Sequence, residues 1–322
     1  MSYEQEKYMC TPETAKETLE QYGVAIIPDV LNKEECEQFV EKIWDYFEHI
    51  TQLWDTPLSR VSKKTWLGIY DLYPSHSMLF QHHSIGQSQA VWDVRQNKKV
   101  VDVYSQIWKI KPEDLLVSFD GLSFGVPPEI TNRGWNRNHT WYHSDQSFTR
   151  KEFECIQGWV TGLDVNEGDA TLAFYEGSNK LHGEFGDRFN ITDKADWYKL
   201  KKEEEQFYKE SGCTEKKIKC PKGSLVLWDS RTIHCGTEAM RTRKKANFRA
   251  IAYTCYQPRS LSNDKQIQKK QKAFNDIRMT SHWPAKIKLF PKKPRTYGGK
   301  LPEVTPISHP KLTELGKRLA GF

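Results

Sequence analysis

The chain has 322 residues and a net charge of +6, from 48 Lys and Arg against 42 Asp and Glu, and 12% of its residues are aromatic. So many large apolar side chains exclude a disordered protein, because they bury enough surface to offset the entropy of folding. No window approaches the roughly 18 apolar residues of a membrane span, and the first ten residues lack the features of a signal peptide. The seven cysteines are irregularly spaced without a CxxC motif, so we expect free thiols and a cytoplasmic protein.

We expect one catalytic domain, whose first part, residues 1–112, forms a helical layer. Residues 1–22 predict a leading helix, and 23–28 a short buried strand that ends at a proline. The next helix begins after Asn32, a capping residue followed three positions later by Glu35. Its apolar residues recur at helical spacing: Cys36, Phe39, Val40, Ile43, Trp44 and Phe47.

Residues 113–257 change to a β-rich pattern. Short runs of β-branched and aromatic residues are separated by Gly, Asp and Asn turns, at 115–119, 156–163, 171–175, 225–228 and 248–256. Such short strands favour a sandwich or jelly roll over βαβ units, so the expected fold is mainly β with helical additions. The Lys- and Glu-rich stretch 179–219 predicts a helical surface insertion between strands.

The remainder, residues 258–322, is predicted to be a basic C-terminal extension. Between Lys265 and Lys300 there are eleven Lys and Arg residues and one acidic residue, Asp276. We expect an extended flank or lid at the edge of the core, because its lysines are spread along it and prolines follow. The alternative is a nucleic-acid-binding surface, which the positive charge would also suit.

The motif that indicates chemistry is His143-Ser144-Asp145, followed by His234 at the end of another predicted strand. Strand alternation sends His143 and Asp145 to the same side, and a later antiparallel strand can supply His234. Two imidazoles and one carboxylate on one face of an octahedral ion leave positions open for a bidentate cosubstrate and dioxygen, as in non-haem Fe(II) oxygenases. His82, His83 and His139 lie in no such pattern, and we expect them to be ordinary polar residues.

A buried cation accompanies the motif. Alternation places Arg249 in the apolar strand 248–256, on the same face as Ile251 and Tyr253. Burying an unpaired charge costs several kcal/mol, so a guanidinium there requires an anion, for which the distal carboxylate of 2-oxoglutarate is suited. Arg243 and Arg241 are the alternative anchors, although neither lies in so apolar a strand.

Together these features resemble the phytanoyl-CoA dioxygenase superfamily of Fe(II)/2-oxoglutarate oxygenases, over most of residues 15–257. The matching segments, in the same order, are 21–24, 31–35, 143–145, 158–164, 168–178, 222–224, His234 and Arg249. The resemblance implies a double-stranded β-helix (jelly-roll) core. It implies His143, Asp145 and His234 as iron ligands, Arg249 as the 2-oxoglutarate anchor, and Trp159 as a wall beside the cosubstrate; the alternative for Trp159 is an ordinary core residue.

The implied cofactors are Fe(II), 2-oxoglutarate and O2, with ascorbate able to stimulate turnover. Two departures from the family pattern argue against phytanoyl-CoA itself as substrate: Ser144 within the motif and Asn179 in place of a histidine. A third departure, the longer gap between His234 and Arg249, is what leaves Arg243 or Arg241 as alternative anchors. We expect hydroxylation of a small-molecule or lipid-like substrate, with release of succinate and CO2. The alternative is a nucleic-acid-directed oxygenase or binding module that uses the basic C-terminal segment. No feature of the sequence specifies an oligomeric state.

Overall fold

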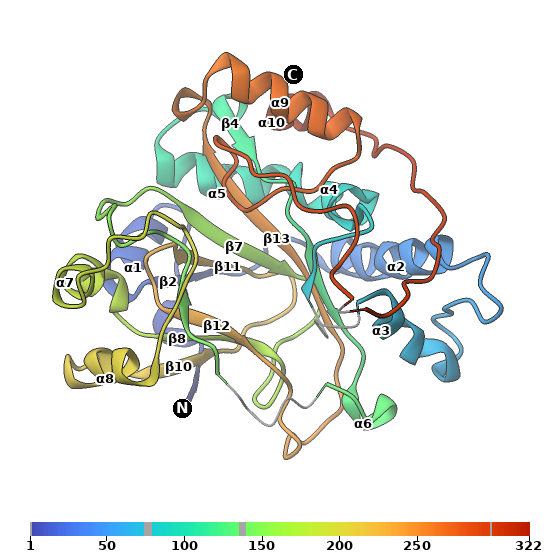
Figure 1. Ribbon diagram of the computed structural model, residues 1–322, viewed down its shortest axis with the longest axis horizontal. Helices are drawn as coiled ribbons and strands as arrows, with labels where there is room; N and C mark the ends of the chain where they lie inside the picture. Colours follow the sequence, from blue (N-terminus) through green and yellow to red (C-terminus); the bar gives the residue numbers. More distant parts are fainter. Residues whose placement is uncertain (1, 74–78, 135–139, 297) are drawn as a thin grey trace.

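The computed structural model describes residues 2–73, 79–134, 140–296 and 298–322 (Figure 1). Its strands are β1 (Ser2–Glu4), β2 (Val24–Ile27), β3 (Leu79–Phe80), β4 (Leu115–Val117), β5 (Leu122–Gly125), β6 (His143–Ser144), β7 (Ile156–Thr161), β8 (Thr171–Tyr175), β9 (Tyr198–Lys199), β10 (Glu215–Ile218), β11 (Leu225–Asp229), β12 (His234–Thr237) and β13 (Arg249–Pro258). Its α-helices are α1 (Ala15–Tyr22), α2 (Lys33–Ile50), α3 (Ile69–Leu72), α4 (Gln89–Arg95), α5 (Lys98–Trp108), α6 (Pro128–Thr131), α7 (His182–Arg188), α8 (Lys202–Glu210), α9 (Asp264–Asn275) and α10 (Glu314–Leu319).

The strands form two facing sheets. One has the order β1-β10-β8-β12-β6-β9, and the other β2-β11-β7-β13-β5-β3, with β4 also pairing with β13. The neighbouring strands run antiparallel, except that β1 runs parallel to β10. An apolar cluster that includes Trp159, Phe174 and Ile251 draws on strands of both sheets. This arrangement confirms the expected mainly-β jelly-roll fold.

Helices from the N-terminal layer cover one face of the larger sheet (Figure 1). In α5, the Tyr104 hydroxyl donates to the Thr254 carbonyl of β13 at 3.0 Å, and the Trp108 indole donates to the Tyr256 carbonyl at 2.9 Å. The helices α7 and α8 of the 179–219 stretch pack instead against the smaller sheet, through an aromatic cluster around Phe185. Each sheet is therefore covered by helices: the larger sheet by the N-terminal layer, and the smaller sheet by α7 and α8.

The N-terminal expectations are only partly correct. Helix α2 starts as predicted: Asn32 Oδ1 accepts from the Glu35 amide, and the Glu35 carboxylate accepts from the Asn32 amide. The leading helix is shorter than predicted, however, because residues 2–4 form β1 and pair with β10. Strand pairing and the Tyr3 ring packed against Lys217 decide this segment, and neither contact can be derived from local helical spacing.

The C-terminal extension is not extended throughout, which corrects the prediction for 265–300. Residues Asp264–Asn275 form α9, because Asn263 caps the first turn and Ala273 and Phe274 are buried against the core. The chain then turns back, and Thr280 pairs with Leu289 in an isolated antiparallel bridge. In the part of the chain that the structure describes, no helix combines the length and apolarity that crossing a bilayer requires.

Candidate active site

The structure brings the three candidate metal ligands together at the paired strands β6 and β12. His143 is directly opposite His234 in the antiparallel register, and the Asp145 amide donates to the Ser230 carbonyl at 3.2 Å. One ligand atom from each of His143, Asp145 and His234 lies within 4.8 Å of the others. As strand alternation predicts, the side chains of His143 and Asp145 lie on the same side. Ser144, between them, is turned away and donates to the Gln146 carbonyl.

Backbone carbonyls fix the orientation of both imidazoles. Nδ1 of His143 donates to the Trp141 carbonyl at 3.2 Å, and Nδ1 of His234 donates to the Thr232 carbonyl at 2.8 Å. The other ring nitrogen, Nε2, faces Asp145, at 3.6 Å from His143 and 3.3 Å from His234. The arrangement presents two imidazole nitrogens and one carboxylate to a shared point.

The site's electrostatics match what a divalent cation requires of its ligands. Burial raises the pKa of the Asp145 carboxyl, but the charge and hydrogen bonds of His143 and His234 outweigh it and hold that pKa well below its usual range. Burial, aided by the nearby His143, lowers the pKa of His234. An ionised carboxylate is the state in which Asp145 can bind a metal, and a donor set of two imidazoles and one carboxylate suits Fe(II).

A cavity of about 420 Å³ connects the three ligands with the predicted cosubstrate residues. Arg249 and Trp159 line it, as do Tyr253 and Ser123. Ser123 Oγ accepts from Arg249 Nε at 3.0 Å, and the Ala170 carbonyl accepts from Nη1 at 2.5 Å. The guanidinium lies over the Trp159 ring, 5.6 Å from its centroid. Both residues are thus placed where the sequence predicted, beside the ligand cluster.

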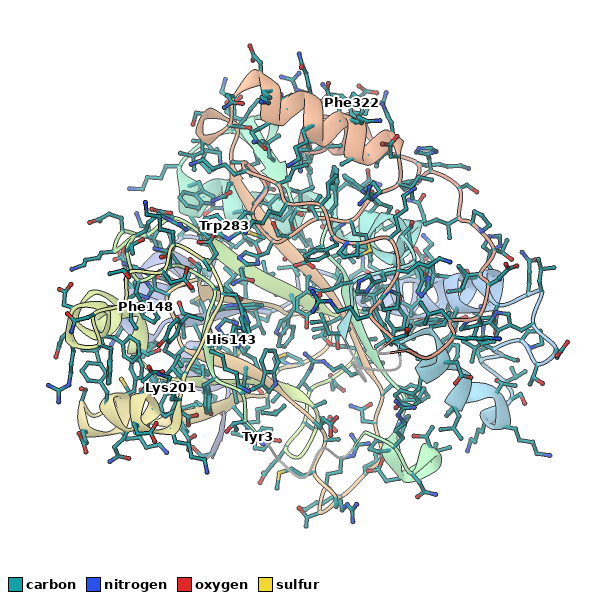
Figure 2. All side chains as sticks on the ribbon, in the orientation of Figure 1. Tyr3, His143, Phe148, Lys201, Trp283 and Phe322 are labelled. Carbon is teal, nitrogen blue, oxygen red and sulfur yellow. The ribbon has the colours of Figure 1, made fainter. Side chains whose placement is uncertain are left out.

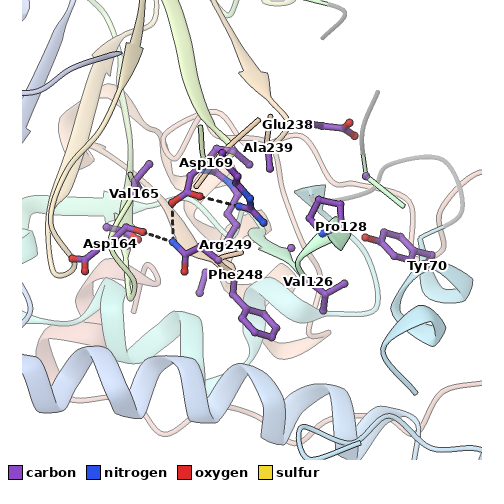
Figure 3. A pocket seen from close by; sticks show the side chains of 17 residues that line it. Tyr70, Val126, Pro128, Asp164, Val165, Asp169, Glu238, Ala239, Phe248 and Arg249 are labelled. Atoms are coloured by element: carbon purple, nitrogen blue, oxygen red, sulfur yellow. Dashed lines mark hydrogen bonds and ion pairs between the residues drawn. The ribbon is translucent and has the colours of Figure 1, made fainter. Parts of the chain in front are cut away.

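Arg249 carries a buried charge without a carboxylate partner among the described residues. Only 8% of its surface is exposed, and burial lowers its pKa. Arg243, the alternative anchor, differs: it forms ion pairs with Glu129 at 2.6 Å and Asp169 at 2.8 Å. Figure 3 shows Asp169 near Arg249 in an adjoining pocket of about 40 Å³, where it also accepts from Asn247.

The Arg243 guanidinium therefore already has two anionic partners, whereas that of Arg249 faces the cavity. Arg241 is exposed and does not line the cavity. His83 lies elsewhere, with its ring near the Leu72 carbonyl, and His139 lies outside the described residues. Of the three arginines that the sequence allowed as anchors, Arg249 is the one that lines the cavity together with the candidate metal ligands.

Several site residues were not predicted from the sequence. Gln157 donates to the Asp145 carboxylate at 2.9 Å, and strand alternation with Trp159 could have revealed it. The cavity is also lined by residues from three segments that carried no functional pattern: Asp120, Trp197, His282, Trp283, Lys288 and Phe290. The 282–290 residues belong to the C-terminal extension, and Figure 2 labels Trp283 above His143.

Comparison with known proteins decides the family. Residues 19–247, more than two thirds of the chain, match the phytanoyl-CoA dioxygenase (PhyH) family. The chain belongs to this family. Membership, together with the His-Asp-His cluster, makes it a non-haem iron and 2-oxoglutarate-dependent oxygenase. The match ends two residues before Arg249, so the position of Arg249 rests on the structure.

Individual relatives of this PhyH protein share only 12% to 24% of their residues with it. It is 24% identical over 270 residues to Ava biosynthesis cluster protein O of Aspergillus versicolor, covering 81% of this chain and 83% of that one. Among solved structures it resembles GlcNAc Inducible Gene 2 (GIG2) of Candida albicans, with a TM-score of 0.54, 12% identity and coverage of 84% and 68%. It also resembles the hypothetical protein JW0805 of Escherichia coli, with a TM-score of 0.54, 13% identity and coverage of 96% and 81%. These structures share its fold.

Proposed function

We propose that the protein binds one Fe(II) through His143, Asp145 and His234 and uses 2-oxoglutarate and O2 to hydroxylate a small-molecule or lipid-like substrate. The observation that carries this proposal is that the three ligands and the unpaired Arg249 line one cavity. Bound iron, 2-oxoglutarate and O2 together supply an oxidant able to break a C–H bond, with succinate and CO2 as co-products.

The chain's own residues position the reactants. Arg249 binds the distal carboxylate of 2-oxoglutarate through its remaining N–H groups, because Nε and one Nη1 hydrogen are used by Ser123 and Ala170. The Trp159 ring, beneath the guanidinium, forms the adjacent wall. The aromatic lining excludes water from the substrate's side of the cavity. A small-molecule substrate also fits a relative whose name places it in a biosynthesis cluster.

Metal analysis tests the ligand assignment. The protein, stripped of metal and titrated anaerobically with Fe(II), is expected to retain one iron per chain. His143→Ala and His234→Ala are each expected to lower the affinity by at least a hundredfold and to abolish succinate formation, because two ligands do not hold the ion. His49→Ala, on an exposed helical face, is the control and should behave as wild type. Stoichiometric iron in the double variant His143→Ala, His234→Ala would overturn the proposal.

A further inference from the structure

The wall of the active-site cavity contains two carboxylates that the iron chemistry does not use, and one of them lacks an Arg or Lys partner among the described residues. Besides Asp145, the cavity is lined by Asp196 and Asp120. Asp196 pairs with Arg150 at 2.5 Å. Asp120 forms no ion pair with Arg or Lys in the described part of the chain, and it accepts hydrogen bonds from the Gly121 amide, at 2.7 Å, and from the Gln81 side chain. Asp120 is therefore a carboxylate that faces the cavity beside His282, without an Arg or Lys ion pair among the described residues.

Burial makes this lack of a partner costly. Asp120 is 8% exposed, and burial raises the pKa of its carboxyl, although the nearby His282, the Gly121 amide and Arg95 act in the opposite direction. Arg95 is directed elsewhere, because its guanidinium donates to the backbone carbonyls of Asp120 and Gly86. A buried carboxylate is stabilised when a cation binds to it, and the open side of Asp120 is the cavity.

Aromatic rings line the same cavity. Trp141 stacks on the metal-ligand candidate His143, with ring centroids 4.6 Å apart and planes inclined by 6°. Trp197 is 54% exposed although it lines the cavity, and its ring lies 6.0 Å from His143. Trp283 and Phe290 of the C-terminal extension add two more rings. Tryptophan faces attract planar rings and organic cations alike.

From these two features, and resting on the proposed function, we infer that the substrate is a small aromatic molecule bearing a protonated amine, and that Asp120 binds the amine. The other charged groups at the cavity fit this assignment. Arg249 is reserved for the 2-oxoglutarate carboxylate, and Lys288 is exposed to solvent at its side chain. His282 lies beside Asp120, and its Nε2 is buried with no hydrogen-bond partner among the described residues, so it is available to bind the substrate as well.

The test uses three probes that share a naphthyl ring and carry a positive, a neutral or a negative end group: naphthylethylamine, naphthylethanol and naphthylacetate. Binding is measured by calorimetry on the full chain loaded with Fe(II) and 2-oxoglutarate under nitrogen. The amine is expected to bind at least tenfold more tightly than the alcohol or the acid. Equal affinities in the wild-type protein would overturn the inference, whatever happens to any variant.

Asp120→Asn keeps an oxygen for the Gly121 amide and removes the charge, so it should lower the affinity for the amine to that for the alcohol, which itself stays unchanged. Asp196→Asn removes a charge from the same wall and should keep the preference for the amine. Trp283→Leu should weaken all three probes by similar factors. An Asp120→Asn protein that retains the preference contradicts the role of Asp120.

The same calorimeter separates this inference from the proposed function. Fe(II) and 2-oxoglutarate are titrated first, before any probe is added. Failure of these titrations counts against the iron and cosubstrate sites. Normal binding of both, followed by no preference for the amine, counts against Asp120 as the recognition residue and leaves the oxygenase assignment intact.

Discussion

Gln157 shows how a residue that binds nothing itself can govern the metal site. Asp145 has two oxygens, and a metal requires one of them to be held in a fixed direction. Gln157 Nε2 donates to Oδ2 at 2.9 Å from a buried position on β7. Because β7 also carries Trp159, one strand orients both a metal ligand and the predicted cosubstrate wall. Partners of this kind tune metal affinity without contacting the ion.

Replacing Gln157 by Leu is expected to weaken Fe(II) binding by about 10- to 100-fold, because Asp145 loses the donor that orients it. The dissociation constant is measured by competition with a metal-binding dye. Gln206→Leu, on the surface helix α8, should leave the constant unchanged. An unaltered constant in Gln157→Leu would mean that His143 and His234 alone orient the carboxylate.

Arg249 is the residue at which 2-oxoglutarate affinity should be most sensitive. Arg249→Leu removes charge-assisted hydrogen bonds worth roughly 1.5–3 kcal/mol each, so the apparent constant for 2-oxoglutarate should rise by at least tenfold while iron still binds. Arg243→Leu is the matched control: it breaks the ion pairs to Glu129 and Asp169 and should reduce stability without changing that constant. The reverse pattern would transfer the anchor to Arg243.

Among the helices and strands, the sequence predicted those whose position is set by capping residues and by the spacing of apolar residues nearby in the chain. The helix after Asn32 follows from a capping residue and apolar spacing, and β8 follows from an apolar run that both sheets bury. By contrast, β1 depends on its pairing with β10 from more than 200 residues away. The ring of Trp197 and the carboxylate of Asp120 reach the cavity through such long-range packing, which explains why the sequence pattern did not reveal them.

The capping box of α2 predicts how much stability one capping side chain contributes. Asn32→Ala removes the side-chain acceptor of the Glu35 amide, keeps the backbone amide that donates to the Glu35 carboxylate, and should lower the free energy of unfolding by about 1 kcal/mol. Urea denaturation followed by circular dichroism measures the change. Lys33→Ala, the next residue, keeps the cap and should stay within about 0.5 kcal/mol of wild type. The same loss in both variants would show that the cap contributes nothing specific.

For the whole molecule, the C-terminal extension matters because it returns to the cavity. Several of its basic residues have internal partners: Lys270 is buried against the Val117 carbonyl, Lys269 donates to the Ile287 carbonyl at 2.8 Å, and Lys272 pairs with Asp276 at 2.9 Å. Two other residues of the extension, Trp283 and Phe290, line the active-site cavity. This favours the interpretation of the extension as a wall of the small-molecule cavity over a nucleic-acid-binding surface.

The stability of the whole protein should depend on pH through His182. Its ring is 1% exposed, stacks on Phe148 and hydrogen-bonds the Ser147 carbonyl at 3.2 Å, and burial lowers its pKa to about 4. In the unfolded chain the pKa is roughly 6.5, so below that pH the unfolded state binds the additional proton. The stabilisation is therefore complete above about pH 6.5 and is lost as the pH falls toward 4.

Between pH 7 and pH 5 this group alone should remove about 2 kcal/mol from the free energy of unfolding. The variant His182→Phe cannot take up a proton, so its unfolding free energy should fall by that much less over the same interval, whatever its stability at pH 7. Urea denaturation at a series of pH values measures both slopes. His309→Phe, at an exposed position, should keep the wild-type slope. Parallel curves for wild type and His182→Phe would mean that folding leaves the pKa of His182 unchanged, because only then does acidification remove no stability through this group.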